Sequence, residues 1–315
     1  MSAESESPRP FVNRWSRYGR LWLVATLASA AMVAAIRIVS QAETAPETIA
    51  PGHVPARMLS VNIMSDEILL ALAPERLIGL SVLADDPDSS NIAREAAAVP
   101  ARVSADSEQI IMQSPDFVAI GGHSADVARQ IEELGIPLFR IRGFESIEWI
   151  RRHIGMLGVM AGAPERAERL IADMNRRIDA ISARVAGRPR PRVLLYSASG
   201  WVSGQQTTLD DAISASGGVN VAAEMGIVGG GKISQERVIM ADPDVILLRD
   251  SRKWDSGFRQ ALLRDPAFQG VKALREQRVY SVPARLLVTS SHHIAETVET
   301  IARLLHPDAF PETVP

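Results

Sequence analysis

Two tryptophans stand in sequence surroundings that favour an exposed aromatic ring. Trp201 follows a predicted strand and lies close to Gly200 and Gly204, and Trp254 is surrounded by charged residues. An exposed flat ring could stack on an aromatic ligand, because aromatic rings attract one another in offset arrangements. The alternatives are that Trp201 packs in the interior and that Trp254 belongs to a solvated loop. We name both tryptophans as candidate ligand contacts.

Histidines are the next candidates, because imidazole is a common metal ligand. His123 lies in a Gly-Gly-His-Ser turn, where it could bind a metal or cap a helix predicted to begin near Ser124. His292 and His293 are neighbours, and adjacent residues on a helix point about 100° apart, so they rarely share one ion. We therefore interpret this pair as residues at the start of a helix and predict no metal site.

Motifs of common enzymes are absent from the sequence. Residues 196–200 read Tyr-Ser-Ala-Ser-Gly, which lacks the first glycine of a nucleophile elbow. Residues 229–232, Gly-Gly-Gly-Lys, lack the spacing of a phosphate-binding loop, and we predict a mobile loop there. The chain has no His-Glu-X-X-His motif and no cysteine, so it offers no thiolate nucleophile and no cysteine-bound metal centre. We predict that the protein is not an enzyme and has no cofactor.

The composition is that of a globular protein. The chain has 315 residues, of which 46% are hydrophobic and 23% charged, so it has enough apolar surface to offset the entropy lost on folding. Domains usually hold roughly 100–200 residues, which favours two domains or one large one. The net charge of −3 argues against a nucleic-acid partner, because such proteins show a basic excess.

The N-terminal segment differs from the rest of the chain. Residues 1–20 hold four arginines, and the run Leu21–Ile36 then carries no charge. This pattern is typical of a secretory signal, and Ser40–Ala42 offers small residues for cleavage after residue 42. An uncleaved membrane anchor is the alternative, because an arginine follows the apolar run. Residues 43–56 are rich in proline and predict a flexible tether, so we expect a periplasmic protein.

Segments typical of strands and helices alternate through two blocks, 57–145 and 190–310. In the first block we predict strands at 58–64, 77–82, 117–121 and 137–141, and helices at 66–72, 107–112 and 125–134. In the second block we predict strands at 192–197, 245–248 and 278–282, and helices at 208–216, 235–240, 258–263 and 292–305. Such alternation indicates α/β lobes with mostly parallel sheets.

The two blocks contain an internal repeat. Glu108–Val118 matches Glu236–Ile246 with identical Glu, Ile, Met, Pro and Asp at a constant offset of 128. Each copy predicts a short helix, a Pro-Asp turn and a buried strand. The simpler reading is a common helix–turn–strand unit, but the identical spacing favours two pseudo-symmetric lobes. Asp106 and Ser234 are the predicted N-caps of the two short helices.

Residues 146–187 show no strand pattern and are expected to be a helical linker. From Pro164 to Val185, apolar residues recur at steps of three and four, which predicts an amphipathic helix. Pro164 suits the first turn of this helix and Gly187 suits its end. We expect a single long, rigid helix to join the two lobes.

Five segments of the body stand in a recognisable order. They are SVNIMSDEILLALAPERLIGLS (60–81), SPDFVAIGG (114–122), RVLLYSASGWVSG (192–204), GGVNVAAEMG (217–226) and ISQERVIMADPDVILL (233–248). Together they resemble the class III periplasmic substrate-binding proteins, which serve ABC importers of cobalamin, siderophores and heme. The resemblance covers about residues 56–306. It departs from the family pattern at Ala73-Pro74, where the family usually has a glycine.

This resemblance implies an α/β fold of two Rossmann-like lobes with a ligand cleft between them, at the loops that follow the strands. It implies capture of a bulky metal chelate (cobalamin, a ferric siderophore or heme) and its delivery to a permease dimer in the inner membrane. We expect Trp201, Trp254 and His123 to contact the ligand. Arg285 follows the last predicted strand, where the resemblance suggests an anion-binding residue. A surface ion pair is the alternative for Arg285.

The resemblance also implies a docking role for the repeated glutamates. One glutamate per lobe in this family pairs with arginines on the two permease subunits, and Glu108 and Glu236 match by position. The alternative is that carboxylates simply favour the first turn of a helix. We expect a monomer. The rival functions are a zinc- or manganese-binding protein of a related importer, which six histidines in the whole chain support poorly, and an enzyme.

Overall fold

The structure, a computed structural model, describes residues 54–311 except 122–123, 144, 252 and 254–256. The predicted signal segment, most of the predicted tether, His123 and Trp254 lie outside the described residues. Within the described part, no helix has the length and apolar character needed to cross a membrane.

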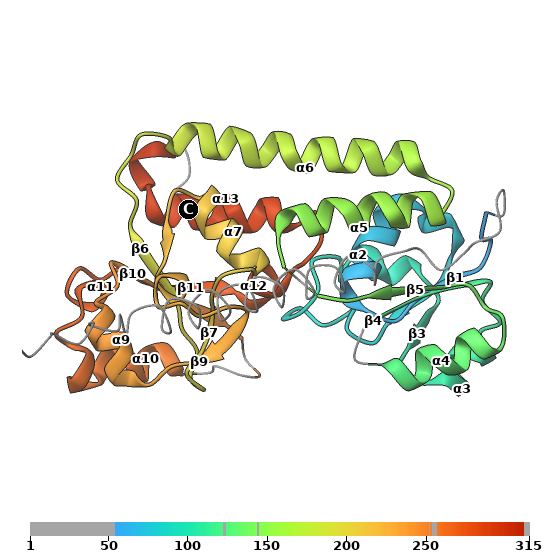
Figure 1. The fold of residues 1–315 in the computed structure, drawn as a ribbon, viewed down its shortest axis with the longest axis horizontal. Coiled ribbons are helices and arrows are strands. Elements are labelled where there is room, and N and C mark those ends of the chain that lie inside the picture. Colours follow the sequence, from blue (N-terminus) through green and yellow to red (C-terminus); the bar gives the residue numbers. More distant parts are fainter. Residues whose placement is uncertain (1–53, 122–123, 144, 252, 254–256, 312–315) are drawn as a thin grey trace, which may run out of the picture. The chain divides into compact units, whose positions relative to one another are not determined.

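A five-stranded parallel sheet forms the N-terminal lobe (Figure 1), with its strands in the order β3-β2-β1-β4-β5. The strands are β1 (Met58–Ser60), β2 (Leu77–Ser81), β3 (Ala101–Val103), β4 (Phe117–Gly121) and β5 (Leu138–Ile141). The helices are α2 (Ile63–Leu72), α3 (Ser107–Met112) and α4 (Ala125–Glu133), with 3-10 turns at Pro74–Arg76 and Glu95–Ala98. Helices between parallel strands supply the crossover connections that such a sheet needs.

The first strand is shorter than predicted, because a helix cap interrupts the apolar run. The predicted strand at 58–64 ends at Ser60, and α2 begins at Ile63, three residues before the predicted start. The side chain of Asn62 accepts a hydrogen bond from the backbone N of Met64 at 3.0 Å. An asparagine in this position satisfies an N–H that the helix cannot pair itself. The sequence analysis also missed β3.

A four-stranded parallel sheet forms the C-terminal lobe, in the order β11-β10-β6-β8. The strands are β6 (Arg192–Leu195), β8 (Val219–Asn220), β10 (Val245–Asp250) and β11 (Val279–Pro283). The helices are α7 (Thr208–Ala215), α8 (Val221–Glu224), α9 (Gln235–Ala241), α10 (Phe258–Arg264), α11 (Lys272–Arg275), α12 (Ala284–Val288) and α13 (Ile294–Leu305). Apolar clusters cover both faces of this sheet, as a parallel sheet requires.

The prediction of a mobile loop at 229–232 is wrong, because this segment forms a strand. β7 (Trp201–Ser203) and β9 (Gly230–Lys232) pair as a two-stranded antiparallel sheet. Trp201 is the register partner of Lys232. A glycine-rich run carries little strand propensity, so only the pairing with β7 reveals the strand.

The predicted helical linker, residues 146–187, contains two helices. α6 (Pro164–Val185) matches the predicted helix, and α5 (Ile147–Met160) precedes it and packs beside it (Figure 1). α6 contacts α2 and α5 toward its N-terminal end, and α7 and α13 toward its C-terminal end (Figure 1). The lobe boundaries at residues 145 and 190 stay predictions.

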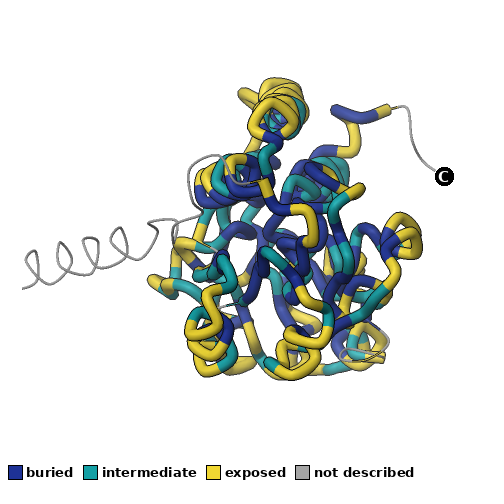
Figure 2. The backbone as a smooth tube through the Cα atoms, turned by 90° about the vertical axis from the view of Figure 1, so that its right-hand side faces the viewer, coloured by how far each residue is buried: buried dark blue, intermediate teal, exposed yellow. Residues whose placement is uncertain are grey.

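One apolar cluster continues beneath α6 from the N-terminal lobe to the C-terminal lobe. It includes Leu69 of α2, Ile154 of α5, Ile178 of α6 and Val298 of α13, all of them buried. Figure 2 shows buried backbone in the interior and exposed backbone on the outer helices and loops. Bending α6 away from either lobe would expose part of this cluster, and exposing apolar area costs about 25 cal/mol per Å².

Candidate functional site

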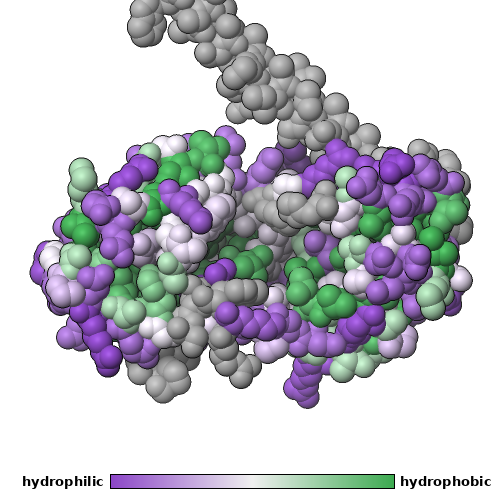
Figure 3. Space-filling model, turned by 90° about the horizontal axis from the view of Figure 1, so that it is seen from below, coloured by the Kyte–Doolittle hydropathy of each residue, from purple (hydrophilic) through white to green (hydrophobic). Residues whose placement is uncertain are grey.

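A cavity of about 350 Å³ opens where the strands of the C-terminal lobe end. Side chains from the end of β6, from β7, from β10 and from α12 line it: Leu195, Tyr196, Ser197, Ser199, Trp201, Ser203, Arg249, Leu287 and Val288. Figure 3 shows the face opposite α6, where hydrophobic side chains flank a hollow. Ligands of open α/β sheets commonly bind at this edge, beyond the carboxyl ends of the strands.

Trp201 lies on the wall of this cavity and is 48% exposed, so it is not a core residue. Its indole lies against Gly230, where an added Cβ would stand 2.8 Å from Cε2 and 3.1 Å from Nε1 of the indole. The hydroxyl of Ser197 accepts a hydrogen bond from the backbone N of Trp201 at 3.0 Å. The antiparallel pair β7 and β9 thus holds the ring in place by backbone contacts. The role of Trp201 as a ligand contact stays a prediction.

Arg249 and Tyr196 share the cavity, and the sequence analysis missed Arg249 as a site residue. Arg249 follows four buried residues of β10. A charged residue at the carboxyl end of a buried apolar strand is the signal that would have pointed to it. Tyr196 is buried, and burial raises the pKa of its phenol above the ordinary value. Its phenol is therefore neutral at pH 7 and offers a hydrogen bond rather than a charge.

Arg285 is engaged with protein partners from both lobes. It lies on α12, and its Nη1 donates to Oδ1 of Asn91 at 2.7 Å and pairs with Oε1 of Glu296 at 3.3 Å. The backbone O of Arg285 accepts from Nδ2 of Asn91 at 3.3 Å. Among the described residues, the lining of the cavity does not include Arg285. The predicted anion contact is therefore still untested, and the structure gives this guanidinium a bridging position.

Glu67 also takes part in the contacts between the lobes, and the sequence analysis did not predict this role. The residue is 2% exposed, and Oε1 of its carboxylate accepts hydrogen bonds from N and Nδ2 of Asn91 at 3.0 and 2.8 Å. Oε2 accepts from the hydroxyls of Thr289 and Ser291 in the C-terminal lobe. A buried carboxylate is tolerated where donors satisfy its oxygens. Two of the four hydrogen bonds to this carboxylate, those from Thr289 and Ser291, therefore connect the two lobes, and the two from Asn91 lie within the N-terminal lobe.

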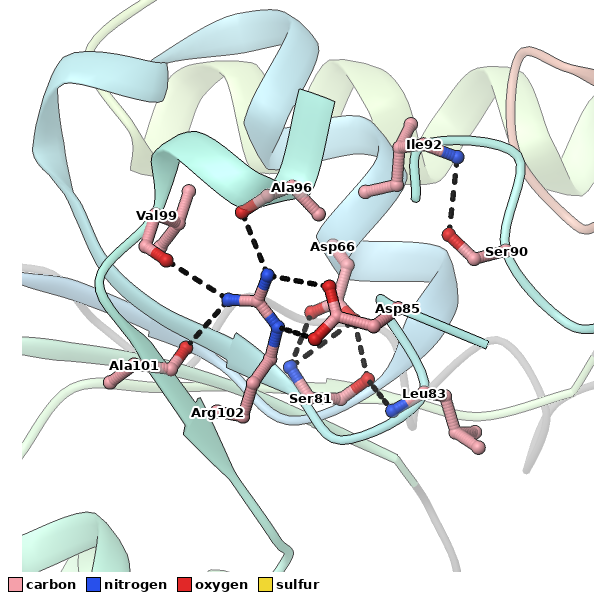
Figure 4. A network of polar contacts seen from close by, with 10 residues as sticks. All are labelled: Asp66, Ser81, Leu83, Asp85, Ser90, Ile92, Ala96, Val99, Ala101 and Arg102. Carbon is pink, nitrogen blue, oxygen red and sulfur yellow. Dashed lines mark hydrogen bonds and ion pairs between the residues drawn. The ribbon is translucent and has the colours of Figure 1, made fainter. Parts of the chain in front are cut away.

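Asp66, the neighbour of Glu67 on α2, is fully buried beside β2 (Figure 4). It accepts hydrogen bonds from the backbone N of Ser81, at 3.1 and 3.2 Å, and from the Ser81 hydroxyl. Burial raises the pKa of Asp66 to about 7, although the bonds from Ser60 and Ser81 oppose this shift. A carboxyl group at the end of β2 thus titrates near neutral pH.

An arginine fixes the loop that follows β2. Arg102 makes two bonds of 2.7 Å to the carboxylate of Asp85 and donates to the carbonyls of Ala96 and Val99 (Figure 4). The same loop carries Val82 and Leu83, which are 56% and 42% exposed. Paired, bidentate bonds of this kind have fixed geometry, so they position the loop.

A second cavity, of about 460 Å³, lies along this loop. It is lined by Val82, Asp85, Asp86, Pro87, Asp88 and Lys253. Nζ of Lys253 lies 2.9 Å from Oδ2 of Asp86, and the hydroxyl of Ser251 donates to Asp88 at 2.8 Å. Polar contacts therefore join the edges of the two sheets here. Within the described ranges, no group of three or more His, Asp or Glu side chains is placed to hold a metal ion.

Glu108 and Glu236 lie in the first turns of α3 and α9, and both are exposed. Asp106 and Ser234 are the N-caps of these helices, which confirms the predicted caps. A hydrogen bond from the Ser234 hydroxyl lowers the pKa of Glu236. Both glutamates are therefore available to a partner, and their docking role stays a prediction.

The two adjacent histidines lie at the start of the last helix, as predicted, although the helix itself begins at Ile294 and not at His292. His293 occupies the N-cap position of α13, and His292 comes directly before it. Burial lowers the pKa of His292 to about 3. Its imidazole is therefore neutral at physiological pH.

The chain is similar in sequence to known substrate-binding proteins. A family model described as "Periplasmic binding protein" matches residues 60–286. An ABC transporter substrate-binding lipoprotein of Bacillus subtilis, YvrC, is 24% identical over 215 residues, 65% of this chain and 66% of that protein. A cobalamin-binding protein of Halobacterium salinarum is 29% identical over 145 residues, 44% of this chain and 39% of that protein. The matches thus span less than two thirds of the length of these relatives.

Solved structures share the fold. The periplasmic heme-binding protein RhuT of Roseiflexus sp. RS-1 superposes with a TM-score of 0.68 at 27% identity, covering 80% of this chain and 98% of that one. The periplasmic vitamin B12-binding protein BtuF of Vibrio cholerae superposes with a TM-score of 0.65 at 19% identity, covering 82% and 99%. The latter similarity concerns the fold alone.

Proposed function

The chain belongs to the periplasmic binding protein family, and we propose that it is the substrate-binding component of an ABC importer. Its ligand is a bulky metal chelate of the cobalamin, ferric-siderophore or heme kind. The protein delivers this chelate to a permease dimer in the inner membrane and catalyses no reaction itself.

The cavity with Trp201 on its wall is the observation that carries this proposal. The indole is held against Gly230 and remains 48% exposed. A ligand with a conjugated ring would cover this apolar area and stack on it. Arg249 lines the same cavity, and guanidinium groups pair with carboxylates and phosphates. A chelate that combines a flat apolar ring with anionic groups fits both side chains.

The loop after β2 supplies a second apolar wall in this proposal. Val82 and Leu83 are exposed at the edge of the N-terminal sheet, and the pair Arg102–Asp85 holds their loop. Exposed apolar side chains that gather at one edge commonly mark a binding surface. A bulky ligand would contact Trp201 on one side and Val82 and Leu83 on the other.

Two relatives support a ring-shaped chelate. The 27% identical solved structure is named as a heme-binding protein, and the Halobacterium relative is named as a cobalamin-binding protein. The rival ligand, a bare divalent cation, has no supporting observation among the described residues. Heme and cobalamin are therefore the first ligands to test.

A binding screen of the purified full chain tests the proposal. The probes are hemin, cyanocobalamin and a ferric hydroxamate, with zinc and manganese chloride as the rival ligands. A chelate at 100 times its dissociation constant should stabilise the fold by about 2.7 kcal/mol, measured as a rise in melting temperature. Absence of a shift with every chelate, or a shift with the bare cations alone, would refute the proposed ligand class.

Replacement of Trp201 tests the site. Trp201→Ala should weaken binding of the chelate by about 1–3 kcal/mol, and Trp201→Phe by less, because a ring remains for stacking. Val159→Ala is the matched control, since Val159 is 71% exposed on α5, away from the cavity lining. Wild-type affinity in Trp201→Ala would show that the ligand binds elsewhere.

We also propose that Glu108 and Glu236 dock the loaded protein onto the permease. They are exposed and occupy equivalent helices of the two lobes. Charged groups of this kind improve steering and register more than raw affinity. Transport should fall in Glu108→Ala and Glu236→Ala while chelate affinity stays unchanged. Wild-type transport in the double variant would show that both are only helix-start residues.

A further inference from the structure

Two methionines outside the ligand cavity stand out by their exposure. Met112 is 80% exposed and Met240 is 84% exposed, the highest values among the large apolar side chains of the described residues. A single exposed apolar residue is ordinary. These two, however, occupy the same position of the internal repeat, at the offset of 128 residues. Equal exposure at equivalent positions points to a shared use.

The two lobes present these methionines in the same backbone setting. Each methionine comes two residues after a buried side chain, Ile110 in α3 and Val238 in α9. Two residues after each methionine, the chain takes a positive φ, 48° at Ser114 and 43° at Asp242. Non-glycine residues adopt this conformation rarely. The same unusual turn therefore ends both segments.

A carboxylate fixes each turn to the strand beside it. Asp116 accepts a hydrogen bond from the backbone N of Arg57 at 2.8 Å, and Asp244 accepts one from the backbone N of Arg192 at 2.7 Å. Arg57 directly precedes β1, and Arg192 begins β6. Each methionine is thus carried on a segment that is anchored to the first strand of its lobe.

The methionines share a helix face with the proposed docking glutamates. Glu108 and Met112 are four residues apart in α3, and Glu236 and Met240 are four residues apart in α9. Residues at this spacing are neighbours on the surface of a helix. Each lobe therefore offers a carboxylate beside an exposed thioether side chain.

We propose that Met112 and Met240 are the apolar anchors of a two-fold docking surface, of which Glu108 and Glu236 are the charged part. The occupant is a permease built from two like subunits, each with an apolar socket beside a basic side chain. The carboxylates steer the partner, and each methionine fills a socket, a task that its flexible, polarisable side chain suits. This inference rests on the proposed function, since it deepens the docking step.

The absence of cysteine from the chain allows a clean crosslinking test. Met112→Cys, Met240→Cys and the control Val159→Cys are each labelled with a benzophenone maleimide, mixed with inner-membrane vesicles of the source organism and irradiated. We expect positions 112 and 240 to capture the same multi-span membrane polypeptide, and position 159 to capture none. Capture of different polypeptides, equal capture from position 159, or no capture would overturn the inference.

A competition experiment tests whether the methionine side chains themselves contribute to docking. Unlabelled wild-type chain and Val159→Gln should suppress crosslinking at the same concentration. The double variant Met112→Gln/Met240→Gln should need an at least tenfold higher concentration to suppress crosslinking. The double variant Met112→Leu/Met240→Leu should compete as well as the wild type. Equal competition by the glutamine double variant would overturn the inference.

Measurements of chelate binding distinguish failure of the docking inference from failure of the proposed function. All variants are titrated with hemin and cyanocobalamin. If the wild type binds a chelate and the glutamine double variant competes normally, the docking inference alone fails. If no chelate binds while positions 112 and 240 capture one polypeptide, the two-fold surface stands and the proposed ligand class fails.

Discussion

Arg57 and Arg192 perform the same task in the two lobes. The Arg57 guanidinium donates to the carbonyls of Gln113 and Ser114, and the Arg192 guanidinium donates to the carbonyls of Ala241 and Asp242. In both lobes these carbonyls lie at the C-terminal end of the short helix that carries an exposed glutamate and methionine. Carbonyls at a helix end lack partners within the helix, so each arginine stabilises the turn. The internal repeat is thus a repeat of structure as well as of sequence.

Loss of the Glu67 carboxylate should loosen the contact between the lobes. Glu67→Ala removes the acceptor for donors on Asn91, Thr289 and Ser291. Each buried donor that is left without a partner costs about 1–3 kcal/mol. We expect the free energy of unfolding to fall by at least about 2 kcal/mol, measured by chemical denaturation.

Glu133→Ala is the matched control for this change, because the side chain of Glu133 is 63% exposed and pairs with Arg129 on the surface. Exposed pairs contribute about 0–1 kcal/mol. A loss in Glu67→Ala no larger than that in Glu133→Ala would show that the bridge does not stabilise the fold.

Asp66 should make stability depend on pH below neutrality. Burial raises the pKa of this carboxyl from its ordinary value of 3.8 to about 7, so the folded state holds a proton that the unfolded state releases. The contribution of Asp66 to stability is therefore complete below about pH 4 and falls as the pH rises through about 7, by up to about 4 kcal/mol.

The difference in unfolding free energy between wild type and Asp66→Asn measures this contribution. Titration of His153 and His292, whose pKa values burial lowers to about 4 and about 3, is common to both proteins and cancels in the difference. The unfolding free energy of the wild type should fall relative to that of Asp66→Asn between pH 4 and pH 7. Above pH 7 the difference between the two proteins should stay constant. A constant difference from pH 4 to pH 7 would contradict the raised pKa.

A methyl group on Gly230 should displace the indole of Trp201. The added Cβ of Gly230→Ala would stand within 2.8 Å of Cε2 of the ring, closer than van der Waals contact allows. We expect chelate affinity to fall as in Trp201→Ala, read by absorbance titration with hemin and cyanocobalamin. Gly270→Ala is the control, since an added Cβ there meets no atom within 4 Å. Wild-type affinity in Gly230→Ala would show that the ring position does not matter.

The N-terminal segment should direct export. We expect the protein recovered from the periplasm to begin at Glu43, after cleavage behind Ala42, because an arginine-rich start precedes the uncharged run Leu21–Ile36. Intact-mass measurement of the periplasmic fraction tests this. A mass that retains residues 1–42, with the protein in the membrane fraction, would indicate an anchor instead.

The sequence by itself determined the local elements and their order. Helix α3 has the predicted bounds Ser107–Met112, strand β4 has the predicted bounds Phe117–Gly121, and α6 begins at Pro164 as predicted. Apolar periodicity, caps and Pro-Asp turns act within a few residues, so a single sequence displays them. The repeat of Glu108–Val118 in Glu236–Ile246 predicted two lobes for the same reason, because it too is visible in the sequence alone.

Only the tertiary structure decided which side chains meet. Arg285 pairs with Asn91, 194 residues away, and Glu67 reaches Ser291, 224 residues away. Gly230 supports Trp201 only because β7 and β9 pair, a contact that no local pattern records. Such contacts depend on the path of the whole chain, and periodicity reports only which face of an element is apolar. The sequence therefore determined the lobes and their exposed helices, and the packing between distant segments determined what lines the cavity and what joins the lobes.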